Sequence, residues 1–198
     1  MIRSLRMIAF AGLLVCLASQ SRAQVTDYLR FYSDVNGTTC FLNYTDLGVA
    51  TVHIFQTGPV RSSAIQFSAI APACWTGATW LGDVVSSEWL SLGSSQDPLY
   101  GLSVATSGCQ DLPIYIGSIN HLVTDASVEC CLYAPGPIDD AETPGTLQYV
   151  DCTNPWPNWP IRPLQPAGLV VNQKPSCHCE QPLSTSATTW GRVKALYR

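Results

Sequence analysis

Short runs rich in β-branched and aromatic residues recur about every 10 to 15 residues along the chain, between clusters of Gly, Pro, Asn, Asp and Ser. This spacing is typical of a β-sandwich or a β-barrel. Before the C-terminus no window keeps the i, i+3, i+4, i+7 apolar spacing of a helix that packs on a core. The pattern therefore predicts strands at residues 28–32, 39–44, 48–55, 64–70, 79–85, 99–106, 114–119, 128–134 and 147–152.

The N-terminus has the three parts of a secretory signal peptide, residues 1–23. Arg3 and Arg6 precede an apolar run over 7–18, and Ser21-Arg22-Ala23 is a small-x-small cleavage site. A run of this length is too short for a membrane-spanning helix, which needs about 20 residues. We expect cleavage after Ala23, a secreted or cell-surface protein, and no transmembrane segment afterwards.

Removal of the signal also removes Cys16 and leaves eight cysteines, an even number that in an exported chain predicts up to four disulfides. They are Cys40, Cys74, Cys109, Cys130, Cys131, Cys152, Cys177 and Cys179. The clusters Cys130-Cys131 and Cys177-His178-Cys179 are soft ligands for zinc or copper, but thiols in an oxidising compartment normally pair with each other. We therefore expect a disulfide-stapled antiparallel β-sandwich, Ig-like or cohesin-like, over 24–152, with no free thiol, no metal and no cofactor.

A strand over 128–134 would send Cys130 and Cys131 to opposite faces, because successive side chains alternate. The two cysteines should therefore join different partners. The alternation places Cys130 with Val128 on the core face and leaves Cys131 to pin a surface loop. Cys109 is a plausible partner for either.

Charge is distributed unevenly. Residues 31–160 hold one base, Arg61, against twelve acids, whereas residues 161–198 hold five bases and one acid. An acidic body repels phosphate backbones, so nucleic acid is a poor partner. The basic end is free to dock on the acidic body.

A Pro/Trp-rich strap, closed by cysteines, occupies residues 153–180. Five prolines between Pro155 and Pro166 favour polyproline II and predict a strap that lies over the sandwich and not within a central ladder. In that form Trp156 and Trp159 would lie roughly 9 Å apart on one side, which suits two sugar rings. The other tryptophans that would add to a glycan site are Trp75, Trp80 and Trp89. The alternative is that these indoles only cover the sheet edge and fill the space under the strap.

Signals for catalysis are weak. Asp139, Asp140 and Glu142, or the pair Asp83 and Glu88, would supply the two carboxylates of a glycosidase, but the first set lies in a Pro/Gly-flanked loop. Asp34-Val35-Asn36-Gly37 resembles the start of a calcium loop, yet an Asn-Gly turn is its commoner meaning. The histidines His53, His121 and His178 fit no metal or nucleophile motif.

Residues 181–198 form a polar linker and a basic, aromatic tail. A helix capped by Thr188 or Thr189 would align Trp190, Val193 and Tyr197, with Leu196 close by; ten residues are marginal without a surface to bind. The ending Thr-Trp-Gly-x-x-Lys-Ala-Leu-Tyr-Arg, with the stretch Gly37-Thr38-Thr39-Cys40, resembles uncharacterised secreted β proteins of environmental bacteria. That resemblance implies an extracellular β protein and carries over no catalytic residue.

Two roles for the tail remain, and both would use Trp190, Lys194, Leu196 and Tyr197. The tail either docks on the sandwich or is an address for export or surface attachment. Gly191 weakens the helix, so the sequence favours the address. For the whole chain we expect a non-catalytic extracellular binding or structural module, whose partner is a glycan or a surface protein. The alternative is a secreted hydrolase that acts on polysaccharide.

Overall fold

A computed structural model describes residues 27–139, 145–157 and 159–179. The predicted signal peptide and C-terminal tail lie outside the described residues. Where the chain is described it forms strands and turns without an α-helix, and no helix in it is long and apolar enough to cross a membrane. The expected class, an all-β fold stapled by disulfides, is confirmed.

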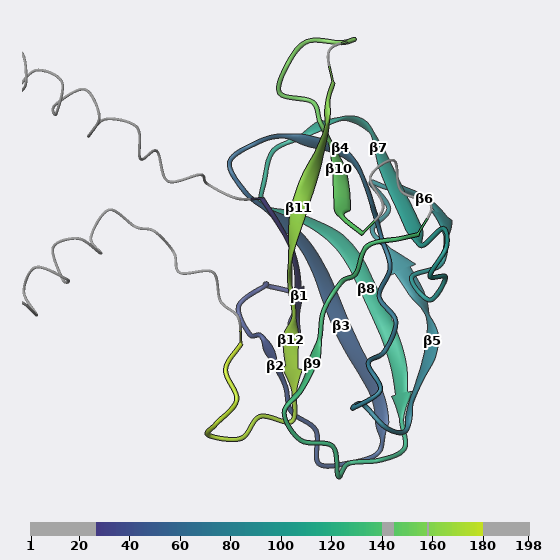
Figure 1. The fold of residues 1–198 in the computed structure, drawn as a ribbon, viewed down its shortest axis with the longest axis vertical. Helices are drawn as coiled ribbons and strands as arrows, with labels where there is room; N and C mark the ends of the chain where they lie inside the picture. The colour runs from purple at the N-terminus through teal and green to yellow at the C-terminus, as the bar shows by residue number, and fades with distance from the viewer. Residues whose placement is uncertain (1–26, 140–144, 158, 180–198) are drawn as a thin grey trace, which may run out of the picture.

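The described residues form twelve strands (Figure 1), and long strands such as β3 and β10 alternate buried side chains with more exposed ones, as the period of two requires. They are β1 (Tyr28–Tyr32), β2 (Phe41–Leu42), β3 (Gly48–Thr57), β4 (Ser62–Phe67), β5 (Ala78–Val85), β6 (Leu90–Gly93), β7 (Leu102–Gln110), β8 (Ile114–Val123), β9 (Cys131–Tyr133), β10 (Leu147–Asp151), β11 (Ile161–Ala167) and β12 (Leu169–Val171). Nine of them form a mixed sheet in the order β5-β8-β3-β1-β11-β10-β4-β7-β6, and β2-β12-β9 form a second sheet.

Strand β11 joins two antiparallel halves of the large sheet, β5-β8-β3-β1 and β10-β4-β7-β6. It runs parallel to β1 and antiparallel to β10. The prediction of a strap over the sandwich is therefore wrong for residues 161–167, which lie in the middle of the sheet.

The two prolines of β11 are tolerated because each half of the strand has one neighbour. Residues 161–164 pair only with β10, and residues 165–167 pair only with β1. Pro163 lies in the first half and Pro166 in the second, so each proline has a partner strand on one side only. Each half thus meets the edge-like condition under which strands accept proline.

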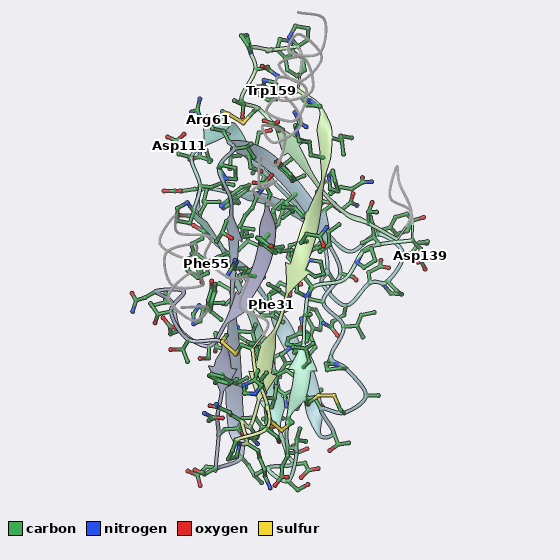
Figure 2. The ribbon with its side chains drawn as sticks, turned by 60° about the vertical axis from the view of Figure 1, so that its left-hand side comes forward. Phe31, Phe55, Arg61, Asp111, Asp139 and Trp159 are labelled. Atoms are coloured by element: carbon green, nitrogen blue, oxygen red, sulfur yellow. A yellow bond between two sulfur atoms is a disulfide. The ribbon has the colours of Figure 1, made fainter. Side chains whose placement is uncertain are left out.

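The large sheet curls around one core. Its edge strands, β5 and β6, are joined by only residues 86–89, which keeps the two edges close together. The Asp83 carboxylate on β5 accepts hydrogen bonds from the backbone N–H and hydroxyl of Ser95, just after β6, at 2.8 and 2.6 Å. Phe31 lies inside, where its ring is 5.0 Å from that of Tyr133 in the small sheet (Figure 2).

Four disulfides link Cys40 to Cys179, Cys74 to Cys131, Cys109 to Cys152, and Cys130 to Cys177. The prediction that Cys130 and Cys131 join different partners is confirmed. Their faces are the reverse of those expected, since Cys131 is buried and Cys130 is exposed. The cause is the left-handed backbone of Cys130, with φ of 53°, which breaks the alternation before β9 begins. Cys109 is the partner of neither.

Asp34 and Gly37 form the turn that the Asn-Gly pair predicts. The N–H of Gly37 donates to the carbonyl of Asp34, and Gly37 has φ of 67°. The Asp34 carboxylate accepts from the backbone N–H groups of Asn36, Thr38 and Thr39. These bonds give the carboxylate a structural role in the turn.

Candidate functional site

Two of the predicted glycan-binding tryptophans belong to the core. Trp75 and Trp89 are 3% and 5% exposed. The indole of Trp75 donates to the hydroxyl of Tyr44, and that of Trp89 donates to the carbonyl of Tyr115. Neither ring is accessible to a sugar, so both indoles fill space in the protein and do not bind a glycan.

Trp156 and Trp159 do come together, in the loop between β10 and β11. Their ring centroids are 5.3 Å apart, closer than polyproline II predicts, and the planes meet at 86°. Trp159 lies at the same end of the molecule as the ion pair of Arg61 and Asp111 (Figure 2). Trp156 is 75% exposed, yet edge-to-face rings do not make the flat row that successive pyranose faces require.

Trp80 lies apart from that pair, on the edge strand β5. Its indole donates to Asp83 at 3.2 Å, and its side chain is partly exposed. The five tryptophans therefore lie in three places and do not form one platform.

Asp83, one of the carboxylates predicted for a glycosidase, holds the edge of the sheet. Asp83 is held by Trp80 and Ser95, whereas Glu88 is exposed. Asp139 is exposed on the other side of the molecule from Arg61 (Figure 2). Asp140 and Glu142 lie outside the described residues.

His121 lies in the core, and His53 lies in a half-buried position beside Tyr115. His121 is fully buried, with Nε2 3.2 Å from the hydroxyl of Tyr133, which donates to the carbonyl of Ala69. Burial lowers the pKa of His121 to about 4, although the charge of Asp83 opposes the change. Burial also lowers the pKa of His53, whose Nδ1 lies 3.3 Å from the hydroxyl of Tyr115.

The cysteine clusters use their sulfurs in disulfides, so the alternative of a soft metal site at Cys130-Cys131 and Cys177-Cys179 is not supported. Among the residues that the structure describes, no three His, Cys, Asp or Glu side chains gather as a metal site would require.

The strongest candidate site is a groove on the outer face of the large sheet, which we call the outer groove. A single transverse row of apolar residues crosses five strands, with each residue paired to the next. The row consists of Leu90, Ala105, Ala64, Val150 and Ile161. The two small alanines form the floor of the groove, and the larger residues at both ends of the row form its walls. The groove therefore results from small side chains lying between larger ones.

A second row lies beside the first and gives the groove its polar contacts. It consists of Leu92, Ser103, Gln66, Gln148 and Pro163. The amide of Gln66 donates to the carbonyl of Tyr100, and that of Gln148 donates to the hydroxyl of Thr146. The groove has a volume of about 340 Å³, within the usual range of binding pockets.

The walls of the outer groove are unusually exposed. Leu90 and Leu92 are 79% and 77% exposed, and Ile161 is 51% exposed. Two acidic residues lie close in sequence to the ends of β6. Glu88 precedes it, and Asp97 lies in the loop that contacts Gln66 through Tyr100.

Sequence reasoning missed this groove because it assigned no strand to residues 90–93. A local signal exists, since Leu90-Ser91-Leu92 alternates as a short strand does. The sequence also alternates along residues 64–67, which places Ala64 and Gln66 on one face of a strand and Ile65 and Phe67 on the other. Only the register, however, places these segments side by side.

The comparisons with protein families, curated proteins and solved structures found no match to this chain.

Proposed function

We propose that this chain is exported through its N-terminal segment and works outside the cytoplasm as a non-catalytic binding module. Its partner is a protein that places an amphipathic, basic peptide segment in the outer groove. The four disulfides indicate an oxidising compartment, extracellular or periplasmic. That compartment agrees with the signal peptide predicted over residues 1–23.

The observation that carries the proposal is the exposure of Leu90 and Leu92 beside an apolar floor. Contiguous apolar surface of this kind marks sites of protein interaction. Covering both leucines would contribute about 3 to 6 kcal/mol before the cost of ordering the ligand. A partner with apolar side chains therefore gains enough for a specific, reversible complex.

The lining favours a peptide over a glycan. Most of the exposed lining is aliphatic. Its polar side chains are Gln66, Ser103 and Gln148, and its one aromatic residue, Tyr149, is 1% exposed. Sugar recognition needs flat aromatic faces together with several polar groups that bond hydroxyls. Glu88 and Asp97 near the leucine wall favour basic residues in the ligand and disfavour acidic ones. Hydrolysis has no comparable support, because Asp83 holds the sheet edges together.

The test is selection of helical peptides from a displayed library on the secreted full chain. We expect the enriched peptides to combine Leu, Trp or Tyr at i, i+3 and i+7 with Lys or Arg. Leu92→Asp should weaken their binding at least tenfold, because it places a charge on the wall where the apolar face of the ligand lies.

Leu81→Asp is the matched control, since Leu81 is 52% exposed on β5 and the change of charge is the same. It should bind the peptides as the unchanged chain does. Equal binding to the Leu92→Asp chain, or enrichment of peptides without apolar residues, would reject the outer groove as the site. A glycan array with the same proteins tests whether the exposed Trp156 gives a separate activity.

A further inference from the structure

The outer groove is wide enough for one helix. Its leucine wall on β6 and its Val150 wall on β10 are three strand spacings apart, about 14 Å between backbones. An α-helix with its side chains is about 10 to 12 Å wide. The alanine floor lets such a helix approach the sheet closely, while a longer side chain at either wall can still cover its flank.

The chain itself contains a segment with the required chemistry. After the last described residue, Cys179, come 19 residues that include Trp190, Val193, Leu196 and Tyr197. A helix would place Trp190, Val193 and Tyr197 on one stripe, and ten residues need such a surface to remain helical. The same segment carries Arg192, Lys194 and Arg198, so its charge is opposite to that of the acidic body.

The start of that segment is fixed, and its length suffices. Cys179 is bonded to Cys40, whose carbonyl accepts from the N–H of Val170 in β12. Nine residues separate Ile161 at the groove from Val170 in β12, which corresponds to roughly 30 Å at the rise of a strand. Eleven residues from Cys179 to Trp190 span at most about 36 to 40 Å.

We propose that the segment from Trp190 to Tyr197 docks in the outer groove of its own molecule and closes that site until an external peptide displaces it. The inference rests on the proposed function, because it requires the groove to be a peptide site. It also assigns the tail a docking role, whereas the sequence alone favoured an address for export or surface attachment. Tethering adds the advantage of a local concentration on the order of millimolar, so even weak contacts keep the groove occupied.

The test compares the secreted full chain with a full chain carrying Trp190→Ala and Leu196→Ala. The probe is a labelled synthetic peptide of residues 189–198. If the attached segment covers at least nine-tenths of the grooves, the unchanged chain should bind the peptide at least tenfold more weakly than the double variant. Adding Leu92→Asp to the double variant should abolish binding, and adding Leu81→Asp should leave it intact.

Each other outcome overturns docking within one molecule. Equal binding to both chains would show an open groove, and it would leave the proposed function standing. Binding that Leu92→Asp does not weaken would place the segment elsewhere. A tenfold difference that disappears on dilution, with dimers in sedimentation, would mean docking on a second copy. If the peptide binds neither chain at millimolar concentration while the library peptides bind, the groove takes external partners only.

Discussion

Replacing Cys74 and Cys131 by alanine should lower the free energy of unfolding by about 5 kcal/mol, as measured by urea denaturation. The disulfide spans 57 residues, and closing a loop of that length in the unfolded chain contributes about 4 kcal/mol. Cys131 is 1% exposed in the core cluster with Trp75 and Tyr133, so loss of its sulfur adds about 1 kcal/mol for the space left behind. A domain of this size is stabilised by roughly 5 to 15 kcal/mol, so the variant should be near its unfolding threshold.

The matched control is the double replacement of Cys130 and Cys177. Their loop of 47 residues predicts nearly the same contribution from chain entropy, about 4 kcal/mol. Each pair joins one exposed cysteine to one buried cysteine, but only Cys131 belongs to the hydrophobic core cluster, and Cys177 does not. The core pair should therefore cost measurably more than the control. If the two double variants unfold at the same urea concentration, Cys131 contributes nothing beyond its cross-link, and the reversed facing described above is wrong.

Acidification from pH 7 to pH 4.5 should lower the free energy of unfolding by about 2 to 3 kcal/mol through His121 alone. Burial beside Trp75 and Tyr133 lowers its pKa to about 4, whereas the unfolded chain has the ordinary value of 6.5. Between these values the unfolded state binds the extra proton, so stability is complete above pH 6.5 and is lost as pH falls toward 4. Each pKa unit corresponds to about 1.4 kcal/mol.

The measurement is urea denaturation at both pH values, for the unchanged chain and for His121→Gln, which cannot acquire the charge. The variant should lose most of the pH dependence, whereas His53→Gln, at a half-exposed position, should retain it. Asp125 titrates lower, because hydrogen bonds from Ser127 and Thr76 reduce its pKa to about 2. Asp27, whose pKa burial raises, has the opposite sign but is present in every chain compared. An unchanged pH dependence in His121→Gln would contradict the assignment.

Local patterns were sufficient for most of the fold. The expected strand at 28–32 coincides with β1, and the expected strands near β3, β5, β8 and β10 differ by a few residues at their ends. Each of these segments has strong alternation and turn residues on both sides. The even count of cysteines likewise predicted four disulfides, although it did not give their pairing.

The errors arose where tertiary structure overrides local preference. The prolines of β11 argued against a central strand, but pairing on one side at a time removes that objection. A left-handed Cys130 shifted the facing of β9, and nothing in the local sequence requires it. The outer groove depends on the register of five strands whose residues come from positions 64 to 161, so it exists only after the sheet has formed.

The position of β11 decides when the molecule can finish folding. Leu29 of β1 pairs with Pro166, which lies 137 residues later in the sequence. One side of β1 therefore has no partner strand until β11 is in place. Until then the four strands β5-β8-β3-β1 and the four strands β10-β4-β7-β6 have no ladder between them. Contacts this distant in sequence slow folding. If the chain is exported unfolded, as we propose, its large sheet closes only after residues 161–167, which form β11, have crossed the membrane.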